Sequence, residues 1–97
     1  MAKLIWSPRS LKDLEIIFEY IKPDSIYNAR NFINQLTKIA ANIPDFPLAG
    51  REAPEYKKTY IREKLYKRYR LIYRIDKDII EIITVVHQSK RIIIKES

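Results

Sequence analysis

The stretch that decides the fold is YRLIYRIDKDIIEIITVVH, residues 69–87, in which two apolar runs flank the polar triplet DKD at 76–78. Tyrosine, isoleucine and valine are enriched in β-strands, whereas aspartate favours tight turns. The pattern therefore predicts a β-hairpin, with strands over residues 65–75 and 79–87 and a two-residue loop between them.

The register of this hairpin follows from burial. If residues 77–78 form the loop, Arg74 lies opposite Glu81, and a one-residue slip would move charged side chains into the core. The residues predicted to face the helices are Tyr69, Leu71, Tyr73 and Ile75 with Ile80, Ile82, Thr84 and Val86. The opposite face then carries Arg68, Arg70, Ile72 and Arg74 with Glu81, Ile83, Val85 and His87.

Positive charge is concentrated in the second half of the chain. Residues 1–50 hold six basic against five acidic residues, whereas residues 51–97 hold thirteen against seven, so the halves carry +1 and +6 of the formal net charge of +7. This asymmetry indicates an anionic partner, which would be a nucleic acid, a membrane surface or an acidic protein.

The predicted register places Arg68, Arg70 and His87 together on one face of the sheet. Arginines interleaved with aromatic residues suit phosphate contact and base stacking. Further members expected nearby are Tyr66, Arg62 from the preceding strand, and Lys90 or Arg91 after the hairpin. Alternatively, the charges only keep an exposed sheet face in water, and Arg70 pairs with a carboxylate such as Glu63.

Two amphipathic helices precede the sheet. The first begins after Ser7, a suitable N-cap followed by a proline, and ends near Lys22 because Pro23 disfavours helical geometry in the residue before it. The second begins after Asp24 or Ser25. The apolar stripes expected to face the sheet are Leu11, Leu14, Ile17, Phe18 and Ile21, then Ala29, Phe32, Ile33, Leu36, Ile39, Ala40 and Ile43.

The remaining segments complete a single domain over residues 1–97. The patterns predict a strand at 2–6, a proline-rich loop at 44–54 and a further strand at 58–63. Helices whose apolar faces must cover a sheet favour a layered fold. We therefore predict the α+β class with the order β-α-α-β-β-β, a helical hairpin packed on a small, mainly antiparallel sheet.

Composition excludes several classes of protein. The chain has no cysteine and one histidine, so we expect no disulfide, no metal site and no cofactor. No apolar run approaches the roughly 20 residues of a membrane-spanning helix, and the N-terminus lacks the core of a signal sequence. We expect a cytoplasmic protein with no membrane partner.

A set of short fragments runs through nearly the whole chain. They are Trp6-Ser7-Pro8, Asp13-Leu14, Tyr20-Ile21, Pro47, Gly50-Arg51, Pro54-Glu55, Arg62-Glu63, residues 69–75, Val85-Val86-His87 and Arg91. In this order and spacing they resemble the RelE/ParE superfamily, the toxic half of bacterial and archaeal toxin–antitoxin pairs.

This resemblance implies one of two activities. One branch, like RelE, cuts messenger RNA in the ribosomal A site without a metal, and the other, like ParE, inhibits DNA gyrase. The long helical hairpin, with Gly50-Arg51 and Arg62-Glu63, is more similar to the ParE branch. We therefore expect the toxin of a type II system that inhibits DNA gyrase, with a ribosome-dependent mRNA interferase as the alternative.

The two activities use the basic residues differently. In an RNA-cleaving enzyme, His87 would exchange protons, and Glu52, Glu63 or a lysine would complement it. The phosphate would be held by arginines, with Arg62, Arg68, Arg70 and Arg91 as the candidates. The absence of tyrosine in residues 90–97 weakens that assignment. In a gyrase inhibitor no proton moves, and the expected target contacts are Arg51, Arg62, Arg68, Arg70, His87, Lys90 and Arg91.

Either branch implies a cognate antitoxin that covers the toxin with an acidic or amphipathic segment. The run Ile92-Ile93-Ile94 suits strand addition by such a partner, or else forms an ordinary edge strand. A nontoxic module that binds nucleic acid or protein through the same basic sheet is a third possibility, which growth arrest on expression would distinguish.

Overall fold

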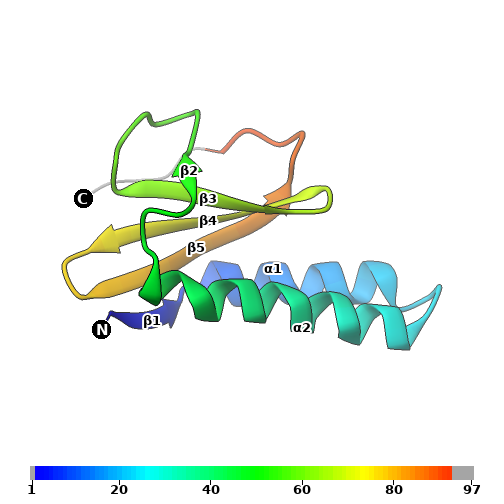
Figure 1. Ribbon diagram of the computed structural model, residues 1–97. Coiled ribbons are helices and arrows are strands. Elements are labelled where there is room, and N and C mark those ends of the chain that lie inside the picture. Colours follow the sequence, from blue (N-terminus) through cyan, green and yellow to red (C-terminus); the bar gives the residue numbers. More distant parts are fainter. Residues whose placement is uncertain (1, 93–97) are drawn as a thin grey trace.

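The computed structural model describes residues 2–92. Two helices lie side by side against one face of a five-stranded sheet, and a loop and the segment after the last strand lie over the other face (Figure 1). The elements are β1 (Lys3–Trp6), α1 (Pro8–Ile21), α2 (Ile26–Asn42), the 3-10 turn η1 (Ile43–Asp45), β2 (Arg51–Glu52), β3 (Ile61–Tyr66), β4 (Tyr69–Asp76) and β5 (Ile79–His87). The predicted α+β class and order are confirmed, with the two-residue β2 as an addition.

Both helices begin at the predicted caps. The Ser7 hydroxyl accepts a hydrogen bond from the Ser10 amide at 3.0 Å, and the Ser25 hydroxyl accepts one from the amide of the third residue beyond it. The sheet-facing line of α1 runs through Ser10 and Ile17, which are buried. Leu11 lies beside this line and is 51% exposed, so its predicted place in the core is wrong.

The sheet has the order β1-β5-β4-β3-β2, in which β1 is parallel to β5 and the other pairs are antiparallel. The predicted single strand over 65–75 is wrong, because the chain turns at residues 67–68 and Tyr66 pairs with Tyr69. Lys67 takes a left-handed conformation with φ of 53°, which lysine adopts less readily than glycine or asparagine. The sequence therefore carries no strong signal for this turn.

A β-bulge changes the register of the β4–β5 hairpin. The predicted pairs hold from the turn as far as Tyr73 with Ile82, but Ile72 then pairs with Thr84, which leaves Ile83 as the extra residue. Beyond this point every predicted pair is shifted by one residue. The predicted faces of Val85 and Val86 are consequently exchanged, so that Val85 packs on the helix side.

The N-cap of α1 and a side chain within the helix support this bulge. The Ser7 hydroxyl donates to the carbonyl of Ile83 at 2.7 Å. One Asp13 carboxylate oxygen accepts hydrogen bonds from the Thr84 hydroxyl and, at 2.9 Å, from the Val85 amide. Irregular strand backbone needs such partners when it is shielded from water, so α1 and the bulge are held as one unit.

The sheet has an apolar cluster on each face. The larger cluster packs the helices on the sheet and includes Leu36, Tyr73 and Ile82. A smaller cluster on the opposite face joins the loop after β2 to the end of the described chain, and consists of Ala53, Ile61, Ile72, Val86 and Ile92. The face predicted to be open and basic is therefore partly covered.

The proline-rich loop is fixed to the sheet by the Tyr73 hydroxyl. It donates to the Pro47 carbonyl at 2.6 Å and accepts from the Gly50 amide at 3.1 Å. A Cβ atom at Gly50 would lie 2.6 Å from both the Tyr73 hydroxyl and the Glu63 carbonyl, so the close approach requires glycine. Within the described residues, neither helix combines the length and the apolar composition needed to cross a bilayer.

Candidate functional site

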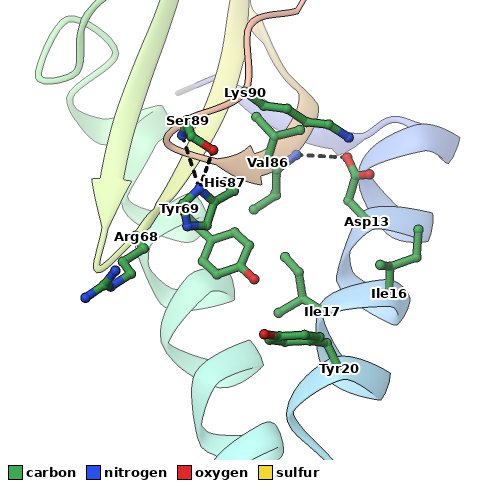
Figure 2. Close-up of a pocket in the computed structure, with 11 residues that line it drawn as sticks. Asp13, Ile16, Ile17, Tyr20, Arg68, Tyr69, Val86, His87, Ser89 and Lys90 are labelled. Atoms are coloured by element: carbon green, nitrogen blue, oxygen red, sulfur yellow. Dashed lines mark hydrogen bonds between the residues drawn. The ribbon is translucent and has the colours of Figure 1, made fainter.

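A groove of about 620 Å³ runs between α1 and the adjoining ends of β4 and β5 (Figure 2). Ile17, Tyr69 and Val85 form apolar walls, and the Ile16 and Tyr20 side chains extend from α1. Ile16 is 57% exposed and Tyr20 is 77% exposed, although both are large and apolar. Exposed apolar side chains beside a concave surface are typical of a binding site.

The polar residues of the groove come from both sides. The Tyr69 and Tyr20 phenols belong to the same cavity, and burial, with a smaller effect of Tyr20, raises the pKa of Tyr69. The His87 ring meets the Tyr69 ring edge-on at 5.7 Å, and its Nδ1 accepts from the Ser89 amide at 3.1 Å. Asp13 also lines the groove, where its hydrogen bonds to the bulge fix its orientation (Figure 2).

Four exposed basic residues lie in the β3–β4 turn and in the segment that follows β5, and we call them the basic end: Lys67, Arg68, Lys90 and Arg91. Two of them, Arg68 and Lys90, line the groove. The Gln88 amide donates to the Arg68 carbonyl at 2.7 Å, and its side chain donates to the Lys67 carbonyl at 2.6 Å. These bonds hold the β3–β4 turn beside the segment that follows β5.

Arg70, predicted to lie on the basic face beside Arg68 and His87, is instead a buried structural residue. Its side chain is 3% exposed. The guanidinium donates to Glu63 at 2.7 Å, to both carboxylate oxygens of Glu55 at 2.7 and 2.5 Å, and to the Lys90 carbonyl at 2.8 Å. The alternative interpretation, in which Arg70 pairs with Glu63, is confirmed.

This ionic cluster also holds the end of the described chain. Glu55 accepts from the Ile92 amide at 3.3 Å, and the hydrogen bonds from Arg70 hold the pKa of Glu55 at about 2. The same bonds raise the pKa of Arg70. Both groups therefore remain charged at neutral pH, and together they tie β4 to the loop after β2 and to residues 90–92.

The arginines of β2 and β3 are also engaged within the fold. Arg51 pairs with the buried Glu63 at 2.5 Å, and Arg62 donates to the carbonyls of Gly50 at 2.6 Å and Thr59 at 2.8 Å. Glu63, considered as a catalytic carboxylate, is thus fully committed to two arginines. Glu52 is exposed in the short strand β2.

The predicted grouping of Arg68 with His87 is confirmed, since both line the groove, but the inclusion of Arg70 is wrong because the bulge places His87 on the other side of the sheet. Tyr69 pairs with His87 and Arg70 pairs with Val86, so His87 follows Tyr69 to the groove side while Arg70 points to the opposite side. Tyr66, expected on the basic face, packs against Phe32 of α2. Ile92 lies in the smaller apolar cluster, and the predicted partner strand at Ile93 and Ile94 lies outside the described residues.

Two features of the site were missed by sequence reasoning. Ile16 and Tyr20 lie off the predicted apolar stripe of α1, and their four-residue spacing was the available signal for a second apolar surface. The second missed feature is Asp13, a carboxylate followed on the same helix by the apolar Leu14, Ile16 and Ile17. Within residues 2–92, no group of three or more histidine, cysteine or carboxylate side chains is placed to hold a metal ion.

A family model described as the ParE toxin of the type II toxin–antitoxin system parDE matches residues 4–92. The chain belongs to the ParE toxin family. It is accordingly a toxin of a type II toxin–antitoxin system within the RelE/ParE superfamily, as the resemblance implied. A search of curated protein sequences finds no significant match.

Solved structures share the fold of this ParE-family chain. A chromosomal ParDE system from P. aeruginosa has a TM-score of 0.75 at 16% identity, covering 90% of this chain and 96% of that one. The YoeB dimer of Staphylococcus aureus has a TM-score of 0.60 at 16% identity, with coverage of 89% and 95%. A heterotetrameric YoeB–YefM toxin–antitoxin complex from the same organism gives 0.56 at 18% identity, with coverage of 90% and 97%.

The ionic cluster makes a pH-dependent contribution to stability. The depressed pKa of Glu55 stabilises the fold above its ordinary value of 4.5, and this stabilisation is lost as the pH falls toward about 2. Glu55→Gln should therefore lower the free energy of unfolding by about 3 kcal/mol at pH 7, and by progressively less as the pH approaches 2. Urea unfolding across this range measures the difference.

The matched control is Glu52→Gln, which neutralises an exposed carboxylate three residues earlier. Its effect should stay within about 0.5 kcal/mol at each pH. A Glu55→Gln difference that did not change with pH would contradict the ionic role of Glu55.

Proposed function

We propose that this toxin acts like ParE, by inhibiting DNA gyrase without cutting RNA. The observation that carries the proposal is the separation of Arg70 from His87. Arg70 is buried in an ionic cluster on one side of the sheet, whereas His87 is exposed beside the groove on the other side.

Metal-free RNA cleavage would need these groups to converge. An acid–base side chain must lie within hydrogen-bond reach of the reacting oxygen, while cations stabilise the charge that develops on the phosphate. Four of the five N–H donors of Arg70 bond groups within the protein. The guanidinium of Arg62 is likewise bonded to loop carbonyls. The predicted catalytic set of His87, Arg62 and Arg70 therefore does not support a common phosphate site.

Inhibition of gyrase needs surface contacts and no proton transfer. The basic end and the apolar groove offer such contacts on a rigid scaffold, since strands β4 and β5 hold both. Arg68, Lys90 and Arg91 are exposed there, and they remain the target-binding residues of the proposal. Arg51 and Arg70 act instead through the fold, because both bond the buried Glu63.

The groove is the proposed docking site for a segment of the cognate antitoxin. The related structures include a ParDE system and a YoeB–YefM complex, both named as toxin–antitoxin assemblies. Apolar side chains of an antitoxin segment would cover Ile16 and Tyr20, while its carboxylates would meet Arg68 and Lys90 at the rim. An amphipathic acidic helix has both properties.

RNA cleavage is the second candidate activity, and one observation favours it. His87 shares the groove with Arg68 and Lys90, so an acid–base group lies in the same cavity as two exposed cations. The fold similarity to YoeB is compatible with this alternative but does not select it. A direct comparison of the two activities is therefore the decisive test.

Purified toxin should inhibit gyrase-dependent supercoiling and should leave messenger RNA on translating ribosomes intact. His87→Ala should change the inhibition by no more than about fivefold, because a contact residue contributes less than a group that transfers a proton. If the wild-type protein cleaves RNA and His87→Ala lowers that cleavage by at least about 100-fold, the toxin is an RNA-cleaving enzyme and the gyrase assignment is wrong.

Ile16→Glu should weaken binding of the cognate antitoxin by about 10- to 100-fold, because it removes apolar contact and adds a charge that repels an acidic segment. Calorimetric titration measures the dissociation constant. Leu11→Glu is the matched control, since Leu11 is 51% exposed on the same helix but does not line the groove. Equal losses in the two variants would show that the segment binds elsewhere.

A further inference from the structure

The basic residues of the second half of the chain fall into two groups. One group is engaged within the sheet, as the pairs of Arg51 with Glu63 and Arg74 with Glu81 show. The other group forms no ion pair with a carboxylate within residues 2–92, and it includes the four cations of the basic end as well as Lys57, Lys58, Lys64 and Lys77. The basic end differs from those four lysines because its cations lie on two segments that Gln88 joins. Its charge is therefore available to a partner.

The two segments that carry the basic end hold no acidic residue. They are YKRY at 66–69 and HQSKR at 87–91. Gln88 fixes the first segment to the second through two hydrogen bonds. Like charges close together repel one another and do not stabilise the fold, so cations held on two joined segments suit an anionic ligand.

We propose that the basic end binds the phosphate backbone of duplex DNA. This inference rests on the proposed function, because gyrase acts on duplex DNA and a toxin docked on it would meet that DNA. The cations lie on two segments that hydrogen bonds from Gln88 join. This arrangement suits sequence-independent contact with phosphates, which positions a protein without reading bases.

The nearby aromatic residues favour duplex DNA over single-stranded RNA. Recognition of unpaired bases needs aromatic faces on which the bases stack. Tyr66 and Tyr69 pack against Phe32, with ring centroids 5.0 and 5.4 Å apart, and Tyr69 also meets the His87 ring. The faces of Tyr66 and Tyr69 are thus engaged within the fold. Tyr20, which is 77% exposed, shares the groove with Arg68 and Lys90 but belongs to α1 and not to the two segments of the basic end. Charge contact is therefore the main source of affinity that these two segments offer.

Fluorescence anisotropy with a duplex of about 20 base pairs tests the proposal between about 50 and 200 mM salt. The test variant replaces Lys67, Arg68, Lys90 and Arg91 with glutamine. The control variant replaces Lys38, Lys57, Lys58 and Lys77, which are exposed lysines outside the basic end. Both variants lower the formal net charge from +7 to +3. Lys77 is a close match for Lys67, because both lie in hairpin turns with positive φ at opposite ends of β4.

Four phosphate contacts predict a slope of about −3.6 for log affinity against log salt concentration. The test variant should lose at least about tenfold in affinity at the lowest salt concentration, while the control variant should keep the wild-type affinity within about threefold. Each single replacement in the basic end should reduce the slope by about 1.

Three outcomes would overturn the inference. They are equal losses in the two variants, stronger binding to single-stranded RNA of the same length, and no binding to the duplex at about 50 mM salt. Supercoiling assays separate this failure from failure of the proposed function. If the toxin inhibits gyrase but does not bind DNA, only the proposed DNA site is wrong. If it binds DNA but does not inhibit gyrase, the assignment as a gyrase inhibitor is wrong.

Discussion

The interaction on which the rest of the structure depends is the buried ionic cluster of Arg70 with Glu55 and Glu63. Removing charged groups from water is costly, and such a cluster persists only when the charges are paired and further hydrogen bonds satisfy their remaining atoms. Arg70 meets this condition through bonds to both carboxylates and to the Lys90 carbonyl. The cluster thereby fixes β3, β4, the loop after β2 and residues 90–92 in one arrangement.

This arrangement divides the charged residues by role. Arg51, Arg62 and Arg70 hold loops and strands together, whereas the basic end remains exposed on a frame that those contacts make rigid. The bulge at Ile83 separates His87 from these structural arginines, because it turns His87 toward the groove beside α1. A toxin with this distribution presents an apolar groove and a charged rim to its partners.

The sequence predicted the fold well because burial imposes clear periodicities on it. Caps at Ser7 and Ser25 located the helices. The polar turn at residues 76–78, with alternating side chains on either side of it, gave the correct pairs as far as Tyr73 with Ile82. The remaining pairs of the hairpin were predicted wrongly because of the bulge. Its hydrogen-bond partners are Ser7, the N-cap of α1, and Asp13 within that helix, which are far from the hairpin in the sequence. Local patterns cannot reveal that support, so the face of His87 was assigned wrongly. Arg70 lies on its predicted face, but Glu55 from the loop after β2 and the Lys90 carbonyl bury it there.

The central claim is that Arg70 serves the fold through Glu55 and does not contact a target. A double-mutant cycle of Arg70→Met and Glu55→Gln, with the free energy of unfolding measured in urea at pH 7, tests this claim most directly. The account predicts that the two changes are strongly non-additive, with a coupling energy of about 2 kcal/mol or more. A coupling energy below about 0.5 kcal/mol would contradict it and return Arg70 to the residues available for a target.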